Sequence, residues 1–284
     1  MKYNFMRFPG GLSKAFTLSY DDGLKTDIRF INKINEYGLK CTFNLTKIHE
    51  NSQTSLTKDE VCELILSKGH EIAVHGYNHR AEGVRRPTEG ILDVLNSRIA
   101  LETAFGIIVR GMAYPDSGII ILNNGVTFER IKNYLKDADI VYARTLGGDN
   151  NSFSIPVDWH AWMPTCHHDN EKLFEYLDEF LNIDISKIYP GRRTSKLFYL
   201  WGHSHEFERN NNWQRLDDIC EKVSRKEDIW YATNMEIYNY VNSYNSLCYS
   251  ADSTIVYNPT LVTIWFDVDG KMYKIEPGET ISIK

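Results

Sequence analysis

Residues 15–23 read AFTLSYDDG, a short run of β-favouring residues that stops at two carboxylates and a glycine. Such a run is typical of a buried strand that opens into a functional loop. Asp21 and Asp22 repel each other there, so the pair persists most easily where a cation, a proton or hydrogen-bond donors compensate the charge. Asp-Gly pairs are also common in turns, and on its own the run favours a plain acidic turn. Residues 75–79, which read HGYNH after another short apolar run, shift the balance toward a functional site.

The composition of the 284-residue chain is that of a globular protein, with 42% hydrophobic and 25% charged residues. A chain of this length forms one large domain or a domain with an appendage. The net charge of −6 argues against nucleic acid as a partner, because no basic surplus exists to neutralise phosphates. No apolar run is long enough to span a membrane, and the N-terminus lacks the apolar core of a secretory signal. Five widely spaced cysteines without a CxxC pattern predict reduced thiols, so we expect a cytoplasmic protein.

Short apolar runs alternate with amphipathic segments along most of the chain. The expected strands are 15–20, 41–45, 71–74, a strand led by 107–109 toward 110–115, 140–144, 196–201 and 229–232. The expected helices are 26–37, 57–69, 91–105, 126–135, 173–181, 213–223 and 235–241, and residues 154–162 are expected to be extended. Alternating strands and helices predict parallel pairing with right-handed crossovers. About seven such strands predict an α/β fold, a distorted (β/α)7 TIM-like barrel over residues 1–245.

The pattern changes after about residue 245. Three further strands, 254–257, 261–266 and 272–275, follow without helices between them, and Asp269-Gly270 is a good hairpin turn. We therefore expect a small C-terminal antiparallel β appendage over residues 246–284. Such an element could bind carbohydrate, mediate dimerisation or simply cover one part of the barrel, and the last is the default expectation.

Polar residues with catalytic or ligand chemistry fall at the expected carboxyl ends of the strands. They are Asp21, Asp22, His75, Tyr114, Arg144 and His203. In a barrel these ends share the face that carries the active site. His75 and His79 lie four residues apart and, with one carboxylate, would leave an open position on a metal, which is typical of catalytic zinc or of an open-site iron. A bare HxxxH pattern is more often two unrelated histidines, but the paired aspartates and His203 favour the metal site.

This set of residues resembles the polysaccharide deacetylases of carbohydrate esterase family 4, the NodB-homology domain. The resemblance covers residues 16–232 in the expected order. Residues 19–23 resemble the T-F-D-D-G motif and residues 75–79 the H-[ST]-x-x-H motif, and both are specific. Three further likenesses are weaker. Tyr114-Pro115 resembles the R-x-P-Y motif, and residues 200–203 resemble the L-x-H motif. Asp158-Trp159, together with Trp162, resembles the fourth motif, whose aromatic residue lines the acetyl pocket.

The resemblance implies a role for each matching residue. Asp22, His75 and His79 would hold a divalent metal, with Zn²⁺ as the first expectation and Co²⁺, Ni²⁺ or Fe²⁺ as alternatives. Asp21 would be the general base and His203 the general acid. The backbone N–H of Tyr114 would help to hold the oxyanion. Asp158, Trp159 and Trp162 would bind substrate, an acetylated oligo- or polysaccharide.

Three departures from the family pattern affect these roles. Ala113 stands where the third motif has proline, and Arg110 lies one residue too far from Tyr114, which makes Arg144 the candidate to hold Asp21. Gly76 replaces a hydroxyl residue in the second motif. Further side chains near the same face could act as extra ligands or orient the acid, although packing or surface roles explain them equally well; they are His167, His168, His205 and Glu206.

The sequence therefore predicts a metal-dependent hydrolase that removes N- or O-linked acetyl groups from a carbohydrate. Two alternatives stay open. The altered third motif is compatible with a catalytically silent barrel that binds sugars. Related barrels also hydrolyse small non-sugar amides or imides, a reaction that needs no aromatic sugar subsites.

Overall fold

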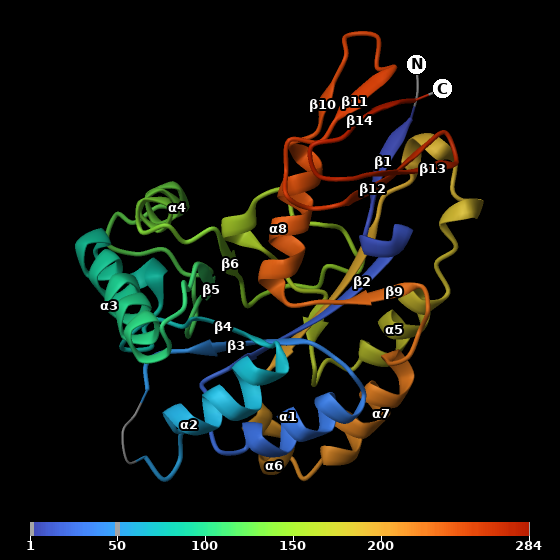
Figure 1. Ribbon diagram of the computed structural model, residues 1–284. Helices are drawn as coiled ribbons and strands as arrows, with labels where there is room; N and C mark the ends of the chain where they lie inside the picture. Colours follow the sequence, from blue (N-terminus) through green and yellow to red (C-terminus); the bar gives the residue numbers. More distant parts are fainter. Residues whose placement is uncertain (1–2, 49–51, 284) are drawn as a thin grey trace.

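A parallel β-sheet lies at the centre of the computed structural model, which describes residues 3–48 and 52–283 (Figure 1). Seven of its strands follow one another in the order β6 (Tyr142–Arg144), β5 (Gly111–Ala113), β4 (Glu71–Val74), β3 (Cys41–Leu45), β2 (Lys14–Asp21), β8 (Lys196–Gly202) and β7 (Cys166–His167). The eighth strand, β9 (Ile229–Tyr231), pairs with the first residues of β2. The sheet curls into an open half-barrel, which confirms the predicted distorted (β/α)7 fold. Its register brings the ends of β2, β4 and β8 together.

Helices connect the strands and cover the outer face of the sheet (Figure 1). They are α1 (Asp27–Glu36), α2 (Lys58–Glu60), α3 (Pro87–Phe105), α4 (Phe128–Asp137), α5 (Leu173–Leu181), α6 (Ser204–Arg209) and α7 (Trp213–Val223). The last helix, α8 (Asn234–Asn245), packs against the opposite face of β2 and β8. The helix expected over residues 57–69 is divided: α2 continues as a π-helical turn, Val61–Ile65, and a 3₁₀ turn, Leu66–Lys68. Its start has a capping box formed by Thr57 and Glu60.

The main hydrophobic core lies between the sheet and these helices. All eight residues of β2 are buried, as expected for a parallel strand that is covered on both faces. Phe16 of β2 stacks on Phe198 of β8 with 5.6 Å between ring centroids, and α1 contributes Phe30 and Ile31 to the same core. β2 is therefore held rigidly, and the residues at its end are fixed with it.

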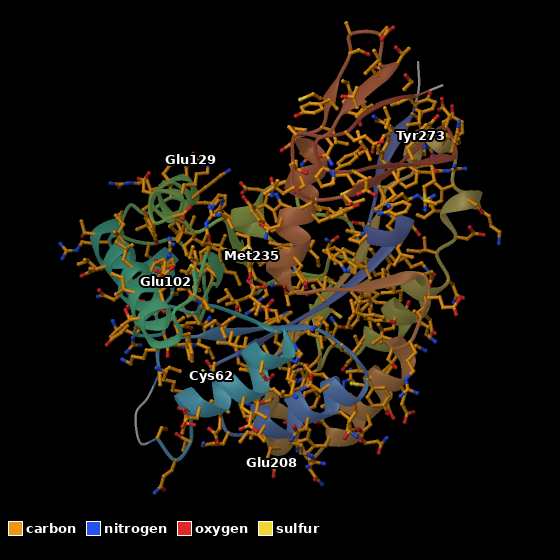
Figure 2. All side chains as sticks on the ribbon, viewed as in Figure 1. Cys62, Glu102, Glu129, Glu208, Met235 and Tyr273 are labelled. Atoms are coloured by element: carbon orange, nitrogen blue, oxygen red, sulfur yellow. The ribbon has the colours of Figure 1, made fainter. Side chains whose placement is uncertain are left out.

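The C-terminal segment forms two small antiparallel sheets. One contains β1 (Asn4–Arg7), β12 (Ile264–Val268) and β13 (Lys271–Ile275), and the other β10 (Cys248–Tyr249), β11 (Ile255–Tyr257) and β14 (Thr280–Ser282). The N-terminal strand β1 thus shares a sheet with residues far along the chain, a pairing that the sequence did not suggest. A second hydrophobic core joins these sheets to α8 and to Leu197 and Tyr199 of the barrel. Figure 2 labels Met235, in the first turn of α8, near the centre of the molecule.

Some local details differ from the sequence expectations. The strand expected to run from residues 107–109 toward 110–115 is shorter: only β5, Gly111–Ala113, pairs with β4 and β6, and Ile107 and Ile108 are exposed. Residues 154–162 contain a 3₁₀ turn, Trp159–Ala161, within irregular structure rather than an extended segment. The short elements β7 and α6 were not expected.

In the described part of the chain, no helix combines the length and apolarity needed to cross a membrane.

Candidate active site

The site begins where β2 ends. Asp21 is the last residue of the strand, and the N–H of Asp22 still donates to the carbonyl of Asn44 on β3 at 3.1 Å. Asp22 then adopts a φ of 80°, in the left-handed region that non-glycine residues avoid. Such a conformation costs on the order of 1–3 kcal/mol and persists where the surroundings enforce it, commonly at functional sites.

Asp22 faces two histidines. One ligand atom from each of Asp22, His75 and His79 lies within 4.8 Å of the others. Oδ1 of Asp22 is 3.4 Å from Nε2 of His79 and 3.8 Å from Nε2 of His75. Nδ1 of His75 donates to the carbonyl of Ala113 at 2.9 Å, so its Nε2 is free to act as a ligand. Burial lowers the pKa of His75, which favours the neutral ring that metal binding requires.

The loop between the two histidines is organised by Asp93 of α3. Oδ1 of Asp93 accepts from the backbone N–H of Asn78 at 3.1 Å and from its side-chain amide at 2.7 Å. Gly76, with a φ of +66°, lies against the same carboxylate: a Cβ at this position would be 2.8 Å from Oδ2 of Asp93. This contact explains why the motif has glycine in place of a hydroxyl residue.

Asp21 is fully buried among donors and cations. Nη2 of Arg144 lies 2.5 Å from its Oδ2, and the amide of Asn44 donates to its Oδ1 at 2.8 Å. Burial alone would raise the pKa of Asp21, but Arg144, assisted by His75 and His203, lowers it below the ordinary value. Arg110 instead pairs with Asp139 at 2.7 Å. The structure thus brings Arg144, and not Arg110, to Asp21.

His203 also lies beside Asp21, with its Nε2 3.7 Å from Oδ2 of that residue. Oε2 of Glu206, in the first turn of α6, lies 3.2 Å from Nδ1 of His203 and also accepts from its backbone N–H. Burial opposes the charged ring, but Glu206 and the nearby aspartates raise the pKa of His203 above its ordinary value. This carboxylate therefore fixes the orientation of the imidazole.

Four expected site residues have other contacts. The N–H of Tyr114 donates to the carbonyl of Arg144 at 3.0 Å, so it is already used within the sheet and cannot hold an oxyanion unless that bond opens. Asp158 pairs with Lys132 at 2.6 Å. Trp162 is fully buried in the second core against Tyr199, and Trp159 packs between Trp162 and Tyr238.

The sequence did not single out Trp201 or Asn44, although both occupy the ends of expected strands. The Trp201 ring lies 4.3 Å from the guanidinium carbon of Arg144 and 5.9 Å from the ring of His203. Asn44 holds Asp21. An aromatic residue next to a catalytic histidine is the signal that could have identified Trp201.

Comparisons with known proteins bear on the family and the fold. Residues 10–143 match the family model described as polysaccharide deacetylase. The fold resembles the Xyl-CE4 domain of a multidomain xylanase from the hindgut metagenome of Trinervitermes trinervoides, with 18% identity, a TM-score of 0.52, and coverage of 81% of this chain and 92% of that one. It also resembles the allantoinase Puue, with 13% identity, a TM-score of 0.59, and coverage of 82% of this chain and 91% of that one. No match to a curated protein was found.

Proposed function

Since residues 10–143 match the polysaccharide deacetylase family model, we propose that the protein is a metal-dependent hydrolase that removes acetyl groups from a carbohydrate. The observation that carries this proposal is the arrangement around Asp22. Three candidate metal ligands lie within 4.8 Å of one another. The proposed base, Asp21, lies beside them, with its Oδ2 3.8 Å from Nε2 of His75.

The donor set fits a divalent metal with an open coordination position. His75 has its free nitrogen directed at Asp22, and His79 completes the pattern of two imidazoles and one carboxylate. Zn²⁺ is the first candidate, and Co²⁺, Ni²⁺ and Fe²⁺ suit the same ligands. When bound, the metal would polarise the acetyl carbonyl and lower the pKa of water.

The remaining chemistry belongs to two residues of the chain. Asp21, kept ionised by Arg144 and Asn44, takes a proton from the attacking water as general base. His203, whose pKa is raised, is suited to give a proton to the departing amine or alcohol as general acid. A carboxylate and an imidazolium beside the same site allow one proton to be taken and another delivered.

One observation favours the alternative of a small non-sugar amide as substrate. Trp162, expected to line a sugar or acetyl pocket, is fully buried in a separate core, and Asp158 binds a lysine instead of reaching the site. A sugar would therefore have to contact other residues, of which Trp201 is the aromatic residue beside His203. A small amide would need no such contact. The silent-barrel alternative is weakened because Arg144 supplies the cation that the third motif lacks.

The test is acetate release with defined metal content. Protein purified without a histidine tag is stripped with a chelator and reloaded with Zn²⁺, Co²⁺, Ni²⁺ or Fe²⁺, and acetate release is measured from p-nitrophenyl acetate and from acetylated xylo- and chito-oligosaccharides. We expect no activity without metal, and no metal at this site in His75→Gln. His70→Gln is the matched control, because His70 is equally buried and contacts Asn35 instead.

The outcomes separate the three functions. Full activity of the metal-free protein would contradict the proposal. Binding of oligosaccharide without turnover would favour the silent barrel. Hydrolysis of a small amide or imide, without acetate release from any glycan, would favour the amidohydrolase.

A further inference from the structure

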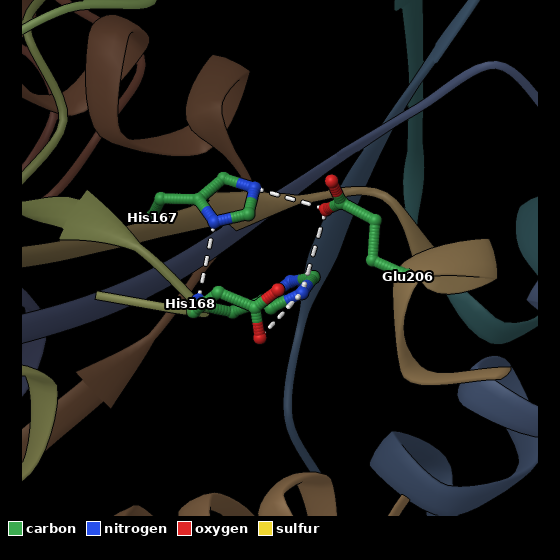
Figure 3. Close-up of side chains that lie close together, drawn as sticks. His167, His168 and Glu206 are labelled. Atoms are coloured by element: carbon green, nitrogen blue, oxygen red, sulfur yellow. Dashed lines mark hydrogen bonds and ion pairs between the residues drawn. The ribbon is translucent and has the colours of Figure 1, made fainter. Parts of the chain in front are cut away.

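A second group of histidines and carboxylates lies next to the catalytic acid. His167 ends β7, His168 and Asp169 follow it, and Glu206 comes from α6. One ligand atom from each of the four lies within 4.8 Å of the others. Figure 3 shows the two imidazoles and the carboxylate of Glu206 converging from the two elements.

His168 presents a buried nitrogen without a partner. Its ring is fully buried and stacks on Phe207 with 4.1 Å between centroids. Nδ1 lies 3.1 Å from the hydroxyl of Tyr20, whereas Nε2 has no hydrogen-bond partner among the described residues. Burial lowers the pKa of His168 to about 2, so the ring is neutral. In the tautomer that has the proton on Nδ1 and donates it to the Tyr20 oxygen, a lone pair on Nε2 faces two carboxylates.

The two carboxylates each direct an oxygen toward this nitrogen. Oδ1 of Asp169 lies 3.6 Å and Oε2 of Glu206 3.5 Å from Nε2 of His168. Oδ2 of Asp169 accepts from the side-chain amide of Asn210 at 2.9 Å, and Oε1 of Glu206 lies 3.2 Å from Arg209. The outer oxygens are therefore held by other residues. The inner oxygens have donors too: Oδ1 of Asp169 accepts from the side-chain amide of Asn212 at 3.4 Å, and Oε2 of Glu206 is contacted by His203 and His167. Both inner oxygens also face Nε2 of His168, and with a lone pair on that nitrogen the contact is repulsive unless a proton or a cation lies between them.

The spacing of these atoms suits a metal ion. Ligands at about 2.1 Å from a tetrahedral ion lie about 3.4 Å from one another. The separations of 3.5 and 3.6 Å in this group are close to that value and to the 3.4 Å between Asp22 and His79 in the active site.

His167 has a different role in this group. Its Nδ1 accepts from the backbone N–H of Asp169 at 3.1 Å, so its proton is on Nε2, which lies 3.0 Å from Oε2 of Glu206. His167 therefore donates to Glu206 and orients it without offering a lone pair of its own.

We propose that His168, Asp169 and Glu206 bind a second divalent transition-metal ion, separate from the one in the active site. One imidazole and two carboxylates suit Zn²⁺, Mn²⁺ or Fe²⁺. Because Asp169 and Glu206 are 28% and 13% exposed, the ion can enter from solvent, whereas His168 anchors the inner side of the site. The inference concerns metal binding and does not depend on which substrate the enzyme hydrolyses.

The test is the number of metal ions bound per chain. Chelator-stripped full-length protein is dialysed against Zn²⁺ and, separately, Mn²⁺, and metal is measured by elemental analysis. We expect two ions in the wild type. Asp169→Asn should lose only the ion of the second site, and Asp22→Asn should lose only the ion of the active site. Glu208→Gln is the matched control on α6, because Glu208 contacts Trp213 instead, and it should retain two. His167→Gln should retain two at saturation but bind one of them about 10- to 100-fold more weakly.

Folding is controlled with a second variant. His168→Phe keeps the aromatic stack with Phe207, so it should unfold at a similar temperature and yet bind one ion. Zn²⁺ X-ray absorption of Asp22→Asn should show one imidazole and oxygen ligands, and adding Asp169→Asn should remove that signal. A wild-type metal content that neither Asp169→Asn nor His168→Phe reduces would overturn the second site. Because Asp22→Asn is measured separately, failure of the active-site metal would be seen independently.

Discussion

Replacing Arg144 with glutamine tests how the proposed base is held. The guanidinium lies 2.5 Å from Oδ2 of Asp21, and both side chains are fully buried. Removing one partner of a buried ion pair typically costs about 3–5 kcal/mol, because the remaining charge stays buried without its counter-ion. Asn44 still donates to the other carboxylate oxygen, so we expect a loss of about 3 kcal/mol, the lower end of that range. A base that is no longer held should also lower kcat, by roughly 100-fold or more.

The assay is urea unfolding of chelator-treated protein, so that metal binding does not contribute to the measured stability. Arg110→Gln is the matched control: Arg110 and its partner Asp139 are 39% and 56% exposed, and such pairs contribute about 0–1 kcal/mol. The double variant Asp21→Asn/Arg144→Gln removes the buried charge together with its partner, so it should be more stable than Arg144→Gln alone. Equal losses in the two arginine variants, or a double variant at least as unstable as the sum of the single ones, would refute this reasoning.

Three further outcomes are expected. His203→Asn should lower kcat about 10²- to 10⁴-fold while metal content, measured by elemental analysis, is unchanged. Trp201→Leu should lower kcat/KM for an acetylated oligosaccharide about tenfold or more, since the ring lies beside Arg144, whereas Trp159→Leu should change it less than about twofold. Burial raises the pKa of Glu82 to about 7, so the folded state holds a proton that the unfolded state releases, and stability falls as pH rises from about 4.5 to 7. Glu82→Gln should remove this loss, of roughly 3 kcal/mol at most, in unfolding curves at pH 5.5 and 8.

The sequence predicted the proposed site because the order and direction of the strands determine where most of its residues lie. Asp21, His75 and His203 each follow an apolar run that forms a buried strand, and parallel strands in one sheet place their carboxyl ends together. The convergence of distant residues then needs no knowledge of side-chain packing. Arg144 was predicted by the same reasoning, since it ends the strand beside β5.

What the sequence missed depends on contacts between distant segments. β1 pairs with β12, with Phe5 opposite Asp267, and no local sequence pattern predicts a pairing between residues so far apart in the chain. β-propensity predicted that Ile107 and Ile108 begin the strand that leads toward residues 110–115, but only Gly111–Ala113 pairs with β4 and β6, and these residues have weaker propensity. Trp162 matched a motif by type and spacing, yet its burial against Tyr199 depends on the second core, which forms only when α8 and the C-terminal strands are in place.

The departures in the third motif form one linked change. Position 111 is where that motif would carry its arginine, but a Cβ there would be 2.2 Å from the hydroxyl of Tyr142, so glycine is required. That hydroxyl donates to Glu71 at 2.6 Å, and Glu71 also accepts from the first turn of α8. The space is thus occupied by a network that anchors the helix. Tyr142 and Arg144 lie on the same face of β6, two residues apart, and Arg144 pairs in register with Ala113. Glycine at position 111 of β5 leaves no guanidinium there. Arg144 on the neighbouring strand β6 supplies one instead, and it contacts Asp21.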